Sequence, residues 1–223
     1  MDIDPVYIDP AYPAYIDPAR LAFDIDGVIA DTMGLFIRIA REDYGITVRF
    51  QDMTRYILEE CLDLSGDLIL EILGRVTGGE RDHHLRPLPG APELITRLAK
   101  TSGGVRFITA RTRQDNIAAW LADITGLPAD RLHVTATGTF DKREALQGTG
   151  VTWFVEDRLE TCLELYEAGI TPILFRQPWN RQPHPFAEIS GCEDLVPMID
   201  FSRETSSDFG PGCDSGSENA GVL

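Results

Sequence analysis

The sequence predicts an α/β protein built on a doubly wound parallel sheet, with a small α-helical cap inserted into it. Short apolar runs, typical of strands buried on both faces, alternate along the chain with helical patterns. One long stretch between the first two predicted strands breaks this alternation, because it has helical patterns and no convincing strand. The 223 residues, 43% of them hydrophobic, are enough for one sizeable α/β domain with a small insertion.

The predicted strands and helices follow one another in the order expected for parallel pairing. Strands are expected at 20–25, 104–109, 131–135, 151–155 and 171–175, and core helices near 91–100, 114–124, 141–147 and 158–168. Asp115 and Asp141 stand near two helix starts, where a carboxylate accepts backbone N–H groups and opposes the helix dipole. Gly169 follows the last helix as its expected C-cap. In a sheet of this kind, a site is expected at the carboxyl ends of the strands.

The insertion divides the predicted core into two pieces. Residues 33–88 form the predicted helical cap, and residues 20–32 and 89–201 form the core around it. The helical patterns of the insertion fall at 33–44, 53–62 and 67–76. Proline and glycine residues around position 89 mark the return of the chain to the core.

The two ends of the chain differ in composition from the rest. Residues 1–19 repeat an Ile-Asp-Pro unit with tyrosines between the copies, which predicts an extended arm. We expect this arm to dock on its own domain or on a second subunit, so that a homodimer is one possible assembly; a disordered leader is the alternative. Residues 202–223 are rich in Ser, Gly, Asp and Glu and are expected to be disordered.

Charge and cysteine usage restrict the partners. The net charge of −16 argues against binding to a nucleic acid polymer or to an anionic membrane, but a small anionic substrate remains compatible with it. The 4 cysteines are scattered without metal-ligand or redox spacing, as expected in a reducing compartment. No secretory signal and no apolar run of roughly 18 residues is visible. These features predict a cytoplasmic protein.

The end of the first predicted strand carries the most informative pair of residues. Asp24 and Asp26 follow an apolar run and precede Gly27. Two carboxylates that repel each other gain from a bound divalent cation, and oxygen ligands suit Mg²⁺. A carboxylate close to such a cation can also attack phosphorus as a nucleophile. The alternative for this segment alone is an acidic turn after a strand.

Three further strand ends carry polar side chains that parallel pairing would bring to the same edge. They are Thr109, Ala110 and Arg111 after the second strand, Lys142 at a helix start after the third, and Glu156 and Asp157 after the fourth. Together they supply carboxylates for a cation, a hydroxyl group, and a lysine that balances an anion. Taken singly, each has a plainer interpretation as a strand residue, a solvated helix lysine or an N-cap.

These four strand ends resemble the motifs of the haloacid dehalogenase superfamily of phosphohydrolases. The motifs are FDIDGV (23–28), FITAR (107–111), Lys142 within FDKREAL (140–146), and FVEDR (154–158). The resemblance covers roughly residues 20–180, in the family's order, and implies a Rossmann-like core with a small helical cap. It also implies a small phosphorylated metabolite as substrate and Mg²⁺ as cofactor.

The resemblance assigns different tasks to the two aspartates. Asp24 matches the nucleophile that becomes an aspartyl-phosphate, and it also contacts the metal. Asp26 matches the general acid and base, and its backbone carbonyl matches a Mg²⁺ ligand. Because Asp26 is present, the resemblance favours a phosphatase over a dehalogenase.

The resemblance also assigns the remaining strand-end residues. Thr109 matches the hydroxyl that hydrogen-bonds the transferring phosphoryl group, and Lys142 matches the cation that neutralises its charge. Ala110 and Arg111 adjoin Thr109 and are expected to contact the phosphate as well. Asp157 matches the main acidic Mg²⁺ ligand, whereas Glu156 is one methylene longer than the family's usual aspartate, which favours contact with the metal through water.

Substrate choice is less defined by the sequence. The segment LFRQPWNR (174–181), with FITAR and Trp120-Leu121, resembles the 5′(3′)-deoxyribonucleotidase-like branch, which implies a nucleoside monophosphate. The plainer interpretation is that Pro178 and Trp179 fix a loop against the sheet. Two alternatives to a phosphatase remain open, a catalytically silent Mg²⁺- and phosphate-binding scaffold and a phosphotransferase.

The predicted cap offers arginines and aromatic residues that could bind a base or a second anion. They are Arg38, Arg41, Arg49 and Arg55, with Phe36, Tyr44, Phe50 and Tyr56. At helical spacing, aromatic residues are more often core and arginines more often solvated. His83 and His84 are expected at the surface.

Overall fold

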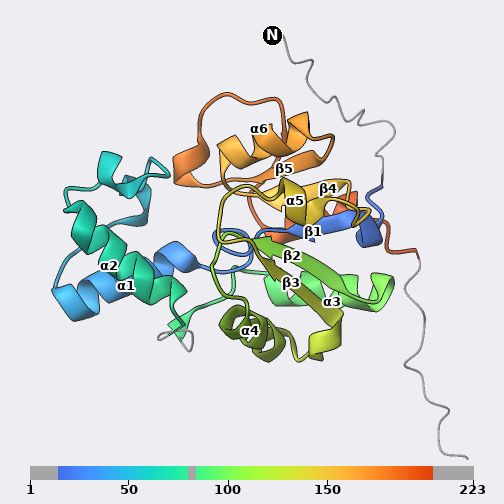
Figure 1. Cartoon of the computed structure of the whole chain (residues 1–223), viewed down its shortest axis with the longest axis horizontal. Coiled ribbons are helices and arrows are strands. Elements are labelled where there is room, and N and C mark those ends of the chain that lie inside the picture. The colour runs from blue at the N-terminus through green and yellow to red at the C-terminus, as the bar shows by residue number, and fades with distance from the viewer. Residues whose placement is uncertain (1–14, 80–83, 203–223) are drawn as a thin grey trace, which may run out of the picture.

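The structure is a computed structural model that describes residues 15–79 and 84–202, and it contains one parallel sheet (Figure 1). The sheet has 6 strands in the order β3-β2-β1-β4-β5-β6. Their bounds are β1 Leu21–Phe23, β2 Val105–Thr109, β3 Leu132–Ala136, β4 Trp153–Glu156, β5 Thr171–Phe175 and β6 Ala187–Ile189. β1 lies in the middle of the sheet. β2 and β3 extend the sheet on one side of β1, and β4, β5 and β6 extend it on the other. The predicted doubly wound α/β fold is therefore confirmed.

The five predicted strands occur close to their expected bounds, and a sixth was missed. β6 pairs in parallel with β5, with Ala187 opposite Ile173. It has 3 residues and follows a proline-containing loop. A strand this short has no periodicity that a sequence pattern can detect.

Within the described parts of the chain, six α-helices accompany the sheet. Their bounds are α1 Thr32–Tyr44, α2 Gly66–Thr77, α3 Ala91–Ser102, α4 Asp115–Thr125, α5 Arg143–Leu146 and α6 Leu159–Glu167. Asp141 lies just before α5, and its Oδ1 accepts the backbone N–H of Arg143 at 3.0 Å. Asp115 is the first residue of α4 and caps no backbone N–H there. Ala168, rather than Gly169, is the C-cap of α6, and Gly169 follows it with φ +81° in the left-handed region that favours glycine.

Successive residues of the central strand face opposite layers of the core. Leu21 and Phe23 join the cluster that contains the buried faces of α3 and α4. Ala22, between them, joins a second cluster with Leu146 of α5 and Leu165 of α6. Helices therefore cover both faces of the sheet, which explains why its strands are continuous apolar runs rather than alternating ones.

The helices α1 and α2 lie between β1 and β2 in the chain and stand together at one end of the molecule, away from the sheet (Figure 1). The two connections to this helical pair run side by side. Ala30 bridges Pro87, the N–H of Asp31 donates to Arg86 at 2.9 Å, and that of Leu88 donates to Ile29 at 2.8 Å. We call residues 32–79 the helical insertion.

The predicted helix at 53–62 was wrong. This segment contains a short 3₁₀ turn at Leu58–Glu60 and is otherwise irregular. Met53 and Leu58 are buried, five positions apart, whereas Tyr56 and Ile57 between them are exposed. This spacing does not produce a continuous face on an α-helix, and it leaves Tyr56 on the open side of the segment.

The last part of the predicted N-terminal arm docks on its own chain. Ile16 is buried and pairs with Ile199, and its N–H donates to Met198 at 2.8 Å. The rest of the arm, residues 1–14, and the tail from residue 203 lie outside the described residues. Dimerisation through the arm therefore stays a prediction. None of the described helices is long and apolar enough to cross a bilayer.

Neighbouring residues of α2 test how this helix packs. Ile69 is 1% exposed, whereas Leu70 is 64% exposed. We expect Ile69→Ala to lower the free energy of unfolding by about 2–5 kcal/mol because it leaves a cavity. Leu70→Ala is the matched control and should change it by about 0.5 kcal/mol or less. Equal losses in urea denaturation of the two variants would contradict this packing.

Candidate active site

The predicted site residues meet at the carboxyl edge of the sheet. Asp24 directly follows β1, Thr109 is the last residue of β2, and Asp157 follows β4. The loop after β1 passes close to the end of β4 at Gly27, which has φ +76°. A Cβ atom at this position would lie 2.3 Å from Oδ2 of Asp157, so the close approach requires glycine. The pairing of β1 with β4 in the sheet thus brings the first and fourth motifs together.

Three carboxylates form a buried cluster at this edge. Asp24, Glu156 and Asp157 each offer an oxygen, and these oxygens lie within 4.8 Å of one another. Burial raises the pKa of Asp24 to about 8, with Lys142 opposing this and the charges of Glu156 and Asp26 reinforcing it. Burial, together with Glu156 and Asp24, also raises the pKa of Asp157 well above its usual value. The cluster therefore favours either protons or a cation.

Lys142 supplies a single positive charge inside this cluster. Its Nζ donates to Oε2 of Glu156 at 2.7 Å and forms an ion pair with Oδ1 of Asp24 at 3.0 Å. The side chain is 2% exposed. Burial acts to lower the pKa of Lys142, but the attraction of Asp24 and Glu156 outweighs it and raises the pKa above its usual value. Lys142 is therefore a buried, charged lysine and not a solvated helix residue.

Both oxygens of Glu156 already have protein donors. Oε2 accepts Lys142, and Oε1 accepts the backbone N–H groups of Asp157 at 3.1 Å and Arg158 at 3.0 Å. These bonds orient Lys142 and the turn after β4. Because both oxygens are occupied, these bonds also favour contact between Glu156 and a metal through water, as expected from its longer side chain.

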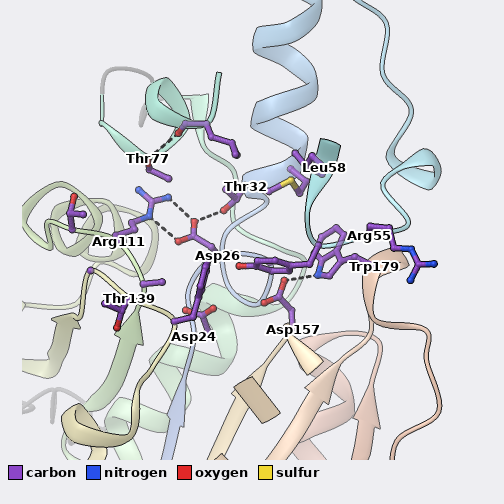
Figure 2. A pocket seen from close by; sticks show the side chains of 18 residues that line it. Asp24, Asp26, Thr32, Arg55, Leu58, Thr77, Arg111, Thr139, Asp157 and Trp179 are labelled. Carbon is purple, nitrogen blue, oxygen red and sulfur yellow. Dashed lines mark hydrogen bonds and ion pairs between the residues drawn. The ribbon is translucent and has the colours of Figure 1, made fainter. Parts of the chain in front are cut away.

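Asp26 has a different environment from Asp24, although the two are separated by one residue. Arg111 donates two hydrogen bonds to the Asp26 carboxylate, from Nε to Oδ2 at 3.0 Å and from Nη2 to Oδ1 at 2.8 Å. The Thr32 hydroxyl also donates to Oδ1, at 2.6 Å (Figure 2). Burial opposes ionisation of Asp26, but the charge and hydrogen bonds of Arg111, aided by Thr32, outweigh it and hold the pKa of Asp26 below its usual value.

Thr109 is fully buried next to this ion pair. Its hydroxyl donates to Oδ2 of Asp26 at 3.4 Å and accepts the backbone N–H of Arg111 at 3.2 Å. The sequence placed Thr109 and Arg111 near a phosphate but gave no sign of the Arg111–Asp26 pair or of Thr32. Such pairs depend on the course of the loops after the strands, which a sequence pattern does not specify.

The carboxylate cluster fits a hard divalent cation. Among the residues that the structure describes, three buried carboxylates share one lysine, and the ion pair with Lys142 is the one polar contact of the buried Oδ1 of Asp24. All the available donors are oxygens, the type that hard cations such as Mg²⁺ prefer. Asp24 and Asp157 are the side chains that could hold such an ion directly.

A cavity of about 330 Å³ opens over Asp24, Asp26 and Asp157 (Figure 2). Residues of the helical insertion and of the core line it together. The insertion contributes Thr32, Met33, Arg55, Tyr56, Leu58, Leu73 and Thr77, and the core contributes Gly27, Ala110, Arg111, Thr112, Gly138, Thr139, Phe140 and Trp179. Its volume suits a small organic ligand, and the acidic cluster lies at its base.

Aromatic contacts join the insertion to the core beside the cavity. The ring of Tyr56 packs edge-on against Phe140 at 5.5 Å between centroids, and the Arg158 guanidinium lies 5.3 Å and 4.7 Å from these two rings. Of the four arginines singled out in the insertion, Arg55 lines the cavity, whereas Arg49 pairs with Asp52 at the surface. His84 is half-buried beside Arg38, 3.5 Å away, and His83 lies outside the described residues.

Comparisons with known proteins agree with this geometry. A sequence model of the family described as 5′ nucleotidase, deoxy (pyrimidine), cytosolic type C protein matches residues 18–204. YqfW of Bacillus subtilis is 27% identical over 170 residues, which is 74% of this chain and 83% of YqfW. Nucleotidase CA_C3379 of Clostridium acetobutylicum is 24% identical over 170 residues, which is 75% of this chain and 85% of that protein.

Solved structures share the fold at low sequence identity. A haloacid dehalogenase superfamily hydrolase of Geobacter sulfurreducens has a TM-score of 0.55 at 14% identity, covering 85% of this chain and 100% of its own. CbbY of Rhodobacter sphaeroides, solved with phosphate, has a TM-score of 0.51 at 18% identity, covering 80% of this chain and 97% of its own. The family match extends over most of the chain and includes all four strand-end motifs. The chain therefore belongs to the cytosolic type C 5′-nucleotidase family of the haloacid dehalogenase superfamily, and it is a phosphoric monoester hydrolase.

Proposed function

We propose that this protein is a Mg²⁺-dependent phosphatase that hydrolyses a nucleoside monophosphate through a phosphorylated Asp24. The observation that carries the proposal is the position of Asp24, which belongs to the acidic cluster at the base of the cavity and is paired there with Lys142. The family match and the description of the Clostridium relative as a nucleotidase support a nucleotide as the substrate.

In the first step, a carboxylate oxygen of Asp24 attacks phosphorus and the bond from phosphorus to the leaving oxygen breaks. Asp26 gives a proton to the leaving oxygen, so that the nucleoside departs neutral. Lys142 stays beside Asp24 and offsets the charge of the phosphoryl group. A bound Mg²⁺ would contribute positive charge that neutralises the phosphate and the carboxylates.

In the second step, water attacks the phosphorus of the aspartyl-phosphate and Asp26 takes the water proton. The low pKa of Asp26 beside Arg111 suits a residue that starts this step ionised. Proton delivery in the first step requires Arg111 to leave Asp26, and the substrate phosphate offers it an alternative anionic partner. The Thr109 hydroxyl lies 3.4 Å from Oδ2 of Asp26 and can hydrogen-bond the phosphate.

The side chains that line the cavity suit a leaving nucleoside, because its base is aromatic. Tyr56 and Phe140 meet at one side, and apolar residues such as Leu58 and Leu73 line the rest. Aromatic side chains stack on bases without requiring a particular base. This composition favours a nucleoside over a small polar alcohol.

We further propose a cytoplasmic location, which the unpaired state of Cys61, Cys162 and Cys192 supports. A homodimer held by the N-terminal arm, residues 1–19, is kept as a proposal on the sequence of the arm alone. Light scattering on a chain that lacks these residues tests this proposal. We expect the measured mass to fall, and an unchanged mass would show that the arm does not hold a dimer.

The proposed nucleophile is tested by Asp24→Asn. We expect Mg²⁺-dependent phosphate release from nucleoside monophosphates to fall by roughly 10³-fold or more, because an amide cannot form the acyl phosphate. The exposed Asp130→Asn variant is the control and should keep wild-type activity. Wild-type turnover by the Asp24→Asn variant would refute the mechanism. If the wild-type protein forms product only with an added nucleoside acceptor, it is a phosphotransferase. If the wild-type protein shows no turnover at all, it is a silent scaffold.

The dependence of Mg²⁺ binding on pH follows from the pKa values of the cluster. The folded pKa of Asp24, about 8, lies above its unfolded value of 3.8, so its stabilising proton is lost as pH rises toward 8. Mg²⁺ binds the ionised form, and its affinity should rise with pH by up to roughly tenfold per unit. The lowered pKa of Asp26 acts only in the acid range, below its usual value of 3.8. We therefore expect Mg²⁺ to raise Tm more at pH 8 than at pH 5.5.

Differential scanning calorimetry at matched ionic strength measures this shift in Tm. NaCl in place of MgCl₂ provides the control for screening. A Mg²⁺-induced shift that is equal at both pH values would contradict the assignment of the cluster as the cation site.

The role of Tyr56 in substrate choice is tested by Tyr56→Ala. Loss of base stacking should raise KM for nucleoside monophosphates roughly tenfold, equivalent to about 1.4 kcal/mol, while KM for glycerol phosphate stays nearly constant. The neighbouring Ile57→Ala is the matched control, since Ile57 is exposed and does not line the cavity. An equal rise in KM for both substrates would show that Tyr56 does not contact the base.

A further inference from the structure

The segment that follows β5 is buried against the site but has no part in the proposed chemistry. It comprises Gln177–Asn180, a single 3₁₀ turn with its capping residue, and we call it the QPWN segment. Gln177, Trp179 and Asn180 are all buried, although each carries polar side-chain atoms. Buried polar atoms require partners, so the partners of this segment show what it stabilises.

Two of these partners belong to Asp157. The indole N–H of Trp179 donates to Oδ2 of Asp157 at 3.0 Å, as Figure 2 shows. The side-chain amide of Asn180 donates to the backbone carbonyl of Asp157 at 2.7 Å and to that of Phe175 at 2.8 Å. The QPWN segment therefore fixes both the main chain and the carboxylate of Asp157.

A third partner belongs to the loop that carries the two aspartates of the first motif. The side-chain amide of Gln177 donates to the carbonyl of Gly27 at 2.7 Å. Within the segment, the backbone N–H of Gln177 donates to Oδ1 of Asn180 at 3.0 Å, which fixes the two amide side chains relative to each other. The loop after β1 and the end of β4 are thus held by one rigid turn.

The chemistry of the indole suits a residue that orients a metal ligand. An indole N–H donates one hydrogen bond and carries no charge. It fixes Oδ2 of Asp157 without adding a positive charge that would compete with a cation. Among the residues that the structure describes, Oδ1 of Asp157 accepts no hydrogen bond, and it remains available for a cation.

We propose that Trp179 is a positioning residue that holds the Asp157 carboxylate in the orientation that binds the divalent cation. This inference rests on the proposed function, because it assigns a metal to the cluster of Asp24, Glu156 and Asp157. Phe50 of the helical insertion packs edge-on against the Trp179 ring, at 5.9 Å between centroids, and covers the indole from that side. The indole that orients Asp157 is therefore held in the core and packs against the insertion through Phe50.

Trp179→Phe tests the inference, since it removes the N–H donor and keeps an aromatic ring. Electron paramagnetic resonance of Mn²⁺ titrated into the full chain measures affinity without turnover. We expect Kd for Mn²⁺ to rise roughly tenfold or more, as for the loss of other groups that orient metal ligands. Higher Mn²⁺ concentration should restore most of kcat, whereas a merely structural defect would not respond to the metal.

Trp120→Phe is the matched control. Trp120 is also buried, and its indole N–H donates to a backbone carbonyl, that of Leu85, at 3.1 Å. It does not line the cavity, so this variant should keep the wild-type Kd for Mn²⁺ while losing a comparable indole bond. Equal Kd values for the wild type and Trp179→Phe would overturn the inference, as would equal weakening in both variants.

Nuclear magnetic resonance of the unsubstituted chain gives a second test that does not depend on the folding of a variant. The chain has 3 tryptophans, and their indole N–H signals are assigned with Trp120→Phe and Trp153→Phe. The Trp179 signal should shift as Mg²⁺ is added, and the Trp120 signal should not. An unmoved Trp179 signal, or no binding of Mn²⁺ by the wild type, overturns the inference. Binding without phosphatase activity would refute the proposed function and leave this inference intact.

Discussion

Three buried carboxylates surround one buried lysine at the carboxyl edge of the sheet, and the rest of the site depends on this imbalance of charge. Lys142 contacts Asp24 and Glu156, but it cannot neutralise Asp157 as well. Burying like charges without a counterion is strongly unfavourable. The cluster is therefore arranged for a second positive charge, and burial together with the neighbouring carboxylates raises the pKa values of Asp24 and Asp157.

The fold meets this constraint by separating the two aspartates of the first motif. Asp24 lies within the cluster, whereas Asp26 points toward Arg111 and Thr32 and has a lowered pKa. Two neighbouring carboxylates thus acquire opposite tendencies to hold a proton, a difference that the proposed nucleophile and the proposed acid and base need. Gly27 of the first motif lets the two strand ends approach each other, because a Cβ atom there would collide with Asp157.

The sequence predicted the parts of the site that follow from strand order, and it did not predict those that depend on loops. Asp24, Lys142 and Asp157 were expected at one edge because parallel strands share their carboxyl ends, and they meet there. The Asp26–Arg111 pair was missed because motif matching assigns each residue singly and not its partner. The helix expected at 53–62 was wrong because buried residues five positions apart do not form a helical face. Tyr56, which the sequence offered as one of several residues that could bind a base, lines the cavity from this irregular segment.

The whole site is arranged around a divalent cation, and anomalous diffraction from crystals of the full chain soaked in Mn²⁺ would locate that ion. We expect one strong peak, bonded to carboxylate oxygens of Asp24 and Asp157, with Lys142 still paired to Glu156. Saturating Mn²⁺ without a peak at this position, or with a peak only elsewhere on the acidic surface, would contradict it.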